Sequence, residues 1–123
     1  MPTQRPLMIL VAGPYRSGTD DKPELIEANV SLMTGIALQL YRMGHLPVLG
    51  EWFALPLIKA AGSEKIGDDI FNEIFHPVAV QLIDHCDAVL RVGGASKGAD
   101  EMITTGRKKG KIIFNSLQDV SAL

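Results

Sequence analysis

The sequence contains very little cysteine: Cys86 is the one instance among 123 residues. A single thiol cannot close an intramolecular disulfide, which excludes the disulfide-rich class of small secreted domains. Residues 1–11 also lack the basic head and the small-residue cleavage site that mark a secretion signal. We therefore expect a reducing compartment, with the cytoplasm as the default location.

An excess of positive charge is also missing. Twelve Lys and Arg residues face 14 Asp and Glu residues, which leaves a formal net charge of -2. Without a net positive field the chain has no general means of holding a phosphate backbone. Nucleic acid is therefore not an expected partner.

The sequence also lacks long apolar runs and clusters of metal-binding residues. The best candidate for a membrane span, residues 30–40, is interrupted by polar residues such as Ser31, Thr34 and Gln39. It falls well short of the roughly 20 apolar residues that a span needs. The three histidines keep no ligand spacing with one another or with Cys86. We expect no membrane span and no bound metal, and no motif indicates a cofactor.

What the sequence does contain is an alternation of short apolar runs with helical periodicities, the pattern of an α/β domain. Residues 7–12 (LMILVA) are almost continuously apolar and stop at Gly13-Pro14, as in a parallel strand that is covered on both faces. Further strands are predicted at 45–49, 88–92 and 111–114, and helices at 21–44, 53–61, 70–85 and 96–109.

Local signals set several of the predicted helix boundaries. Asp21, with Glu24 three residues later, fits a capping box at the start of the first helix. Asp68 or Asp69 is the expected cap of the third helix. Pro77 indicates either a kink in that helix or the first turn of a new one.

The proline in the second strand predicts the order of the strands. Pro47 cannot donate a hydrogen bond to a neighbouring strand, which places residues 45–49 at an edge of the sheet. With right-handed crossovers, this edge position favours the order 2-1-3-4 over 1-2-3-4. The sequence therefore predicts one domain over residues 1–123 with a flavodoxin-like α/β fold, three αβα layers around a parallel sheet of four or five strands.

In this topology a crevice opens at the carboxyl ends of strands one and three, because the helices that follow them lie on opposite faces of the sheet. The loops at these ends cover residues 13–20 (GPYRSGTD) and 93–101 (GGASKGADE). They hold most of the glycine, hydroxyl and ionisable groups that could handle a ligand. These two loops are the predicted site.

The first loop suits an anionic ligand. Backbone amides are accessible at Gly13 and Gly18, and Ser17 offers a hydroxyl. The guanidinium of Arg16 completes a set of groups that fits a phosphate. Thr-Asp follows the second glycine where a Walker A loop requires Lys-Ser/Thr, so a nucleoside triphosphatase is not expected. Tyr15 is a candidate for stacking on a base or a sugar.

The second loop offers another edge for an anion, made of Ser96, Gly98 and the first amides of a helix. Asp100 and Glu101 follow at once. Carboxylates beside a phosphate site repel the anion unless the ligand also has a centre that gains positive charge, such as a sugar carbon. The alternative is that both are helix N-terminal carboxylates favoured by the dipole. Arg91, inside an apolar strand, is expected to pair with a helix carboxylate or at a subunit interface.

Four motifs resemble those of the nucleoside 2-deoxyribosyltransferase superfamily over nearly the whole chain: GPYRSG, GHLPVLGE, CDAVLRV and SKGA. The resemblance implies a flavodoxin-like sheet and a homo-oligomer. It also implies a glutamate in the last loop that attacks or stabilises the anomeric carbon of a deoxynucleoside. Glu101, and less favourably Asp100, is the catalytic candidate, although Met102 stands at the register of the family's nucleophile.

The first loop adds a second resemblance. Its G-x-x-R-x-G form, made of Gly13, Arg16 and Gly18, is similar to that of the deoxynucleoside 5'-monophosphate N-glycosidases. In those enzymes this loop and a serine that matches Ser96 hold the 5'-phosphate. Glu51 falls where this group often has an acidic residue, and its other interpretation is a residue at the rim of the crevice.

The loops and the resemblance together favour an enzyme that hydrolyses or transfers at the N-glycosidic bond of a nucleoside or nucleoside 5'-monophosphate. The alternative is a nucleotide-binding or sensing protein without catalysis, which Met102 at the nucleophile position favours. A flavin-binding electron carrier is less favoured, because the first loop lacks a run of Ser and Thr. The expected partners are a small nucleoside or nucleotide and further copies of the chain.

Overall fold

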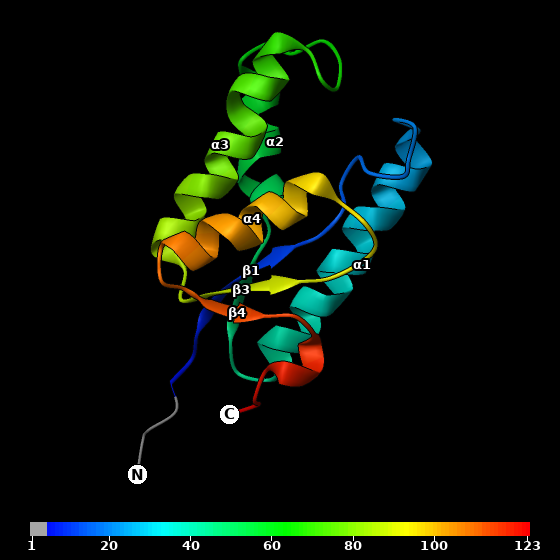
Figure 1. Cartoon of the computed structure of the whole chain (residues 1–123). Helices are drawn as coiled ribbons and strands as arrows, with labels where there is room; N and C mark the ends of the chain where they lie inside the picture. Colours follow the sequence, from blue (N-terminus) through cyan, green and yellow to red (C-terminus); the bar gives the residue numbers. More distant parts are fainter. Residues whose placement is uncertain (1–4) are drawn as a thin grey trace.

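The computed structural model describes residues 5–123 and places a parallel sheet between helices (Figure 1). The sheet has four strands in the order β2-β1-β3-β4, and every neighbouring pair is parallel. This confirms the predicted flavodoxin-like α/β fold and its strand order, with four strands. The elements are β1 (Met8–Ala12), α1 (Pro23–Arg42), β2 (Leu46–Val48), α2 (Gly50–Ala60), α3 (Asp69–His85), β3 (Ala88–Arg91), α4 (Lys97–Lys108), β4 (Ile112–Phe114) and the 3-10 helix η1 (Leu117–Asp119).

The sheet separates two apolar layers. Helix α1 packs Met33 and Leu40 against Ile9 of β1 on one face. Helices α3 and α4 cover the other face, where Ile83 lies in the same buried cluster as Leu10. Ile9 and Leu10 face opposite layers because successive side chains of a strand alternate. Strand β1 is therefore covered on both faces, as its unbroken apolar run predicts.

Helices α2 and α3 form a pair that extends away from the sheet (Figure 1). Ala54, Ile58 and Phe71 form their buried contact. At the start of α2, a Cβ added to Gly50 would lie 3.2 Å from the Cβ of Ala79 on α3. The close approach of the two helices requires a small residue at this point and places the first turn of α2 beside the end of β1.

Two expected boundaries are wrong. The capping box of Asp21 and Glu24 does not form: Lys22 is the N-cap of α1, no side chain caps it, and Pro23 occupies the first turn. Asp21 adopts a left-handed backbone instead, with φ 55°. Helix α2 begins at Gly50 rather than three residues later, so the residue after it, Glu51, lies in a helical first turn.

Other local predictions are confirmed. Pro47 lies in the edge strand β2, opposite Ile9. Asp68 is the N-cap of α3, where its side chain accepts a hydrogen bond from the Phe71 amide. Helix α3 runs continuously through Pro77, so Pro77 does not begin a new helix.

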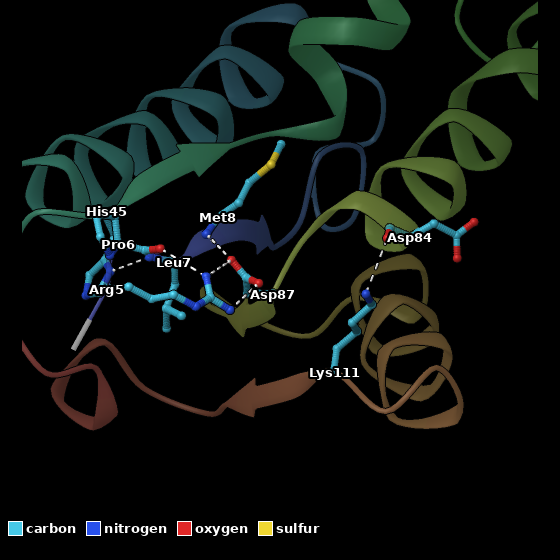
Figure 2. A network of polar contacts seen from close by, with 8 residues as sticks. All are labelled: Arg5, Pro6, Leu7, Met8, His45, Asp84, Asp87 and Lys111. Atoms are coloured by element: carbon cyan, nitrogen blue, oxygen red, sulfur yellow. Dashed lines mark hydrogen bonds and ion pairs between the residues drawn. The ribbon is translucent and has the colours of Figure 1, made fainter. Parts of the chain in front are cut away.

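Polar contacts join the chain at the amino ends of the strands (Figure 2). The Asp87 carboxylate accepts hydrogen bonds from the Met8 amide at 2.8 Å and from the Arg5 guanidinium at 2.9 and 3.2 Å. His45 accepts a bond from the Leu7 amide through Nδ1 at 3.0 Å, and its Nε2 lies 2.8 Å from the Ser121 carbonyl oxygen. These contacts attach the C-terminal segment and the loop before β3 to the start of β1.

Candidate functional site

A cavity of about 190 Å³ lies at the carboxyl end of β1, between the first turns of α2 and α4 and the middle of α3. It is smaller than the ~300–1,000 Å³ of ordinary ligand clefts, which favours a compact ligand over a dinucleotide. It forms at the end of the sheet where the strand order reverses, as ligand sites do in this topology. The predicted site residues that line it are Gly13, Tyr15, Arg16, Ser17, Glu51, Ser96 and Gly98.

Hydrogen bonds inside the first loop hold its shape. The Thr19 side chain is buried, and its hydroxyl lies 2.5 Å from the Arg16 carbonyl oxygen and accepts a bond from the Asp21 amide. Asn29, from α1, donates to the carbonyl oxygen of Tyr15 at 3.0 Å. Gly18 does not line the cavity, and it has φ +76°, a conformation that favours glycine. It shapes the loop rather than facing a ligand.

Tyr15 contributes an aromatic wall to the cavity. Its ring centroid lies 4.9 Å from that of Phe75 on α3. Burial, followed by the negative charge of Glu51, raises the pKa of the Tyr15 hydroxyl. The ring is thus packed on its own protein and still borders the cavity, so stacking on a ligand stays a prediction.

Arg16 lies at the edge of the cavity and is already paired. Its Nε and Nη2 lie 2.8 Å from the two carboxylate oxygens of Asp21. The hydrogen bonds with this carboxylate raise the pKa of Arg16, and the same bonds lower the pKa of Asp21. Arg16, the residue of the first loop expected to bind a phosphate, is therefore paired with an acidic residue next to that loop.

Glu51 is the carboxyl group that the cavity wall itself supplies. It exposes 9% of its surface, and no group in residues 5–123 donates a hydrogen bond to its Oε2. Burial raises its pKa to about 7, because the charged form loses its hydration. A carboxyl group with this pKa exchanges a proton near neutral pH, which is the property of a general acid. The motif at the end of the second strand located Glu51, but nothing in the sequence indicated its burial.

Asp100 and Glu101, the two carboxylates at the end of the second loop, do not line the cavity. Ser96 caps α4 by accepting a hydrogen bond from the Ala99 amide at 3.1 Å. Four residues after Ser96, Asp100 pairs with Arg91 at 3.0 Å, which confirms the ion pair expected for that arginine. Met102 is buried and does line the cavity. Successive residues of a helix differ by about 100° in direction, so α4 turns Met102 inward and leaves Asp100 outside.

Glu101 approaches the cavity indirectly. Its Oε2 lies 3.4 Å from Nε2 of His76 on α3, and His76 is a lining residue. Sequence reasoning missed His76, because its spacing carried no metal-binding or catalytic signal. Only the packing of α3 beside α4 brings the two side chains together.

Within residues 5–123, no group of three His, Cys, Asp or Glu side chains gathers as metal ligands would. Cys86 is buried, and burial raises the pKa of its thiol to about 11, so the thiol is un-ionised at neutral pH. None of the helices in this part of the chain combines the length and apolar character needed to cross a membrane.

A scan of the chain against protein-family models and a search of curated proteins both returned no match. The family resemblance of the sequence motifs therefore stays a prediction.

Proposed function

We propose that the protein is an enzyme that acts on the N-glycosidic bond of a nucleoside or a nucleoside 5'-monophosphate. The observation that carries this proposal is Glu51, a buried carboxyl group with a pKa of about 7 and an unpartnered oxygen in a compact cavity. A buried polar group without a partner costs stability, and such groups gather where a ligand completes them.

The reaction needs an acid because a nucleobase is a poor leaving group. In the proposed step the protonated Glu51 gives its proton to the base while the C–N bond breaks, and the electron pair of that bond goes to the base nitrogen. The sugar carbon becomes oxocarbenium-like and is attacked by water, or by a second base in a transfer reaction, and the attacking group returns a proton to the Glu51 carboxylate. The products of the hydrolytic reaction are a free base and a free sugar from a nucleoside, or a free base and a sugar 5-phosphate from a 5'-monophosphate.

The remaining cavity groups suit the sugar side of such a ligand. The backbone amides at Gly98 and the start of α4 offer donors, strengthened by the helix dipole. The Ser17 hydroxyl lies on the opposite loop. Together these groups bind hydroxyls or a phosphate while Glu51 faces the bond to be broken.

The resemblance implies that a carboxylate of the last loop attacks or stabilises the anomeric carbon. Of the two candidates, Glu101 is the better placed, because it contacts the lining residue His76, whereas Asp100 is engaged with Arg91. We propose that Glu101, which does not line the cavity itself, supports the oxocarbenium-like centre through its contact with His76.

The alternative function is nucleotide binding without catalysis. Met102, an apolar residue, lines the cavity at the register where the resemblance expects a nucleophile. A site that keeps its shape but lacks this carboxylate binds the ligand without cleaving it.

A base-release assay against the common nucleosides and their 5'-monophosphates tests the proposal, and a thermal-shift assay with the same compounds tests the alternative. We expect free base from at least one compound. Glu51→Gln should lower turnover by about 100-fold or more, the usual contribution of a general acid, and leave ligand binding intact. Glu24→Gln is the matched control, because Glu24 is exposed on α1 and does not line the cavity. Stabilisation without any base release would support the binding protein instead.

Two further expectations concern the oligomeric state and the cellular location of the protein. A homo-oligomer is supported by apolar side chains exposed on α2, where Trp52, Phe53 and Leu57 expose 43%, 46% and 52% of their surfaces. Light scattering of the purified protein tests it, and a monomer at all concentrations would contradict it. A cytoplasmic location is tested by fractionating cells that express the protein.

A further inference from the structure

Arg16 is fixed on several sides before any ligand arrives. Besides its two bonds to Asp21, its guanidinium carbon lies 5.6 Å from the centroid of the Phe71 ring. A Cβ added to Gly67 would lie 2.9 Å from both terminal guanidinium nitrogens. The segment before α3 thus packs directly against the Arg16 guanidinium, at a residue whose φ of +84° favours glycine.

The surroundings of Arg16 are acidic. Arg16 and Ser17 line the cavity and also a shallow depression beside it, whose other lining residues are Asp20 and Asp21. An anionic substituent that extends from the cavity on this side therefore meets two carboxylates and a guanidinium whose charge is already matched. Binding a phosphate there requires Arg16 to exchange the Asp21 carboxylate for the phosphate, or to share its donors between the two.

We propose that Asp21 is a specificity determinant: by occupying Arg16, it makes the cavity favour an uncharged nucleoside over the corresponding 5'-monophosphate. This inference rests on the proposed function and selects between the two ligand classes that it leaves open. The discrimination is of the repulsive kind, in which a site rejects one ligand by unfavourable charge rather than by better contacts with the other.

The structure provides a matched pair of variants. Asp20 and Asp21 are neighbours with left-handed backbones, at φ 52° and 55°, a conformation that asparagine also tolerates. Asp21→Asn removes one negative charge and weakens the hold on Arg16. Asp20→Asn removes the same charge one residue away, without touching the bidentate pair.

The experiment measures dissociation constants by titration calorimetry for matched pairs of common nucleosides and their 5'-monophosphates, with inorganic phosphate as a third probe. We expect the wild-type protein to prefer the nucleoside by about tenfold or more, in line with the strength of a charge-assisted pair. Asp21→Asn should raise the affinity for the monophosphate and for inorganic phosphate by about tenfold and leave nucleoside affinity unchanged. Adding Arg16→Gln to Asp21→Asn should remove the gain.

Two results would overturn the role of Asp21: a wild-type protein that prefers the monophosphate, or a gain in Asp20→Asn as large as that in Asp21→Asn. Failure of the proposed function has different signatures: binding without base release from any compound, or no binding of nucleosides and monophosphates to any variant. If no nucleoside or monophosphate binds, the affinity for inorganic phosphate still tests the role of Asp21. A higher affinity in Asp21→Asn alone supports the proposal that Asp21 occupies Arg16, and an unchanged affinity overturns it.

Discussion

His45 at the amino end of the sheet and Glu51 at its carboxyl end are both buried, but they differ in their hydrogen bonds. At the amino end, His45 is buried and both ring nitrogens have partners, and Asp87 accepts bonds from the Met8 amide and from Arg5 (Figure 2). At the carboxyl end, Glu51 is buried and one of its oxygens has no partner in residues 5–123. A satisfied group stabilises the fold, whereas an unsatisfied one costs stability.

This difference indicates where the chain is built for stability and where for a ligand. The amino-end contacts join segments far apart in sequence, such as Leu7 with His45 and His45 with Ser121. These hydrogen bonds engage both ring nitrogens of His45. The cavity end keeps a carboxyl group poised between its two charge states, which serves proton transfer better than it serves stability.

The largest effect should come from titrating the cavity end. The pKa of Glu51 rises from 4.5 to about 7 on folding, so the unfolded chain releases this proton first. The contribution of Glu51 to stability is therefore fully present below about pH 4.5 and is lost as pH rises through about 7, by up to about 3 kcal/mol. In Glu51→Gln this loss should be absent.

Urea denaturation of both proteins at about pH 5 and about pH 8 measures this contribution. The comparison of the variant with the wild type cancels the other titrating groups. Equal losses of stability in the two proteins would show that Glu51 has an ordinary pKa.

At the amino end, removal of His45 should have the next largest effect. His45→Ala leaves the Leu7 amide and the Ser121 carbonyl without their partner and empties a buried space. We expect a loss of about 2–3 kcal/mol in the free energy of unfolding, from unsatisfied backbone groups. Ligand binding should persist wherever the variant remains folded. A loss below about 0.5 kcal/mol, the scale of an ordinary surface substitution, would contradict this role.

Asp87 should show the reverse pH dependence of Glu51. The Arg5 hydrogen bond, followed by that of the Met8 amide, lowers the pKa of Asp87. Its contribution is therefore present above the unfolded pKa of 3.8 and is lost as pH falls through the lower folded value. Asp87→Ala should cost about 1–2 kcal/mol at neutral pH, because the Met8 amide loses its partner. Acid and neutral denaturation curves check both points, and a cost that persists unchanged in strong acid would contradict the second.

The smallest effect is expected within the first loop. Asn29→Ala removes the bond to the Tyr15 carbonyl oxygen, which holds the loop against α1. We expect a loss of about 1 kcal/mol in stability together with weaker ligand binding. Thermal unfolding and calorimetry measure the two. Weaker stability with unchanged binding would show that the loop keeps its shape without this contact.

Much of the fold was predictable from local patterns. The apolar run of residues 7–12 indicated a strand buried on both faces, and Pro47 placed the second strand at an edge. The failed capping box shows the limit of such patterns: Asp21 has the right spacing to Glu24, but its carboxylate binds Arg16 instead. A local motif cannot reveal a stronger competing partner.

The candidate site was predictable in its location and less so in its chemistry. The topology brought the two predicted loops to one cavity, and most of the named residues line it. The direction of each carboxylate depends on the rotation of α4 about its axis and on the elements packed against it. Glu101 contacts His76 of α3, and Asp100 contacts Arg91 of β3. Neither contact has a signature in the spacing of the residues.

By itself the sequence determined the elements, the strand order and the end of the sheet where the cavity forms, because hydrophobic periodicity and the constraints of proline act over a few residues. Only the tertiary structure decided the burial and raised pKa of Glu51, the pairing of Arg16 with Asp21 and the inward position of Met102. These properties arise from desolvation and from contacts between elements, which depend on how the helices pack rather than on local residue order.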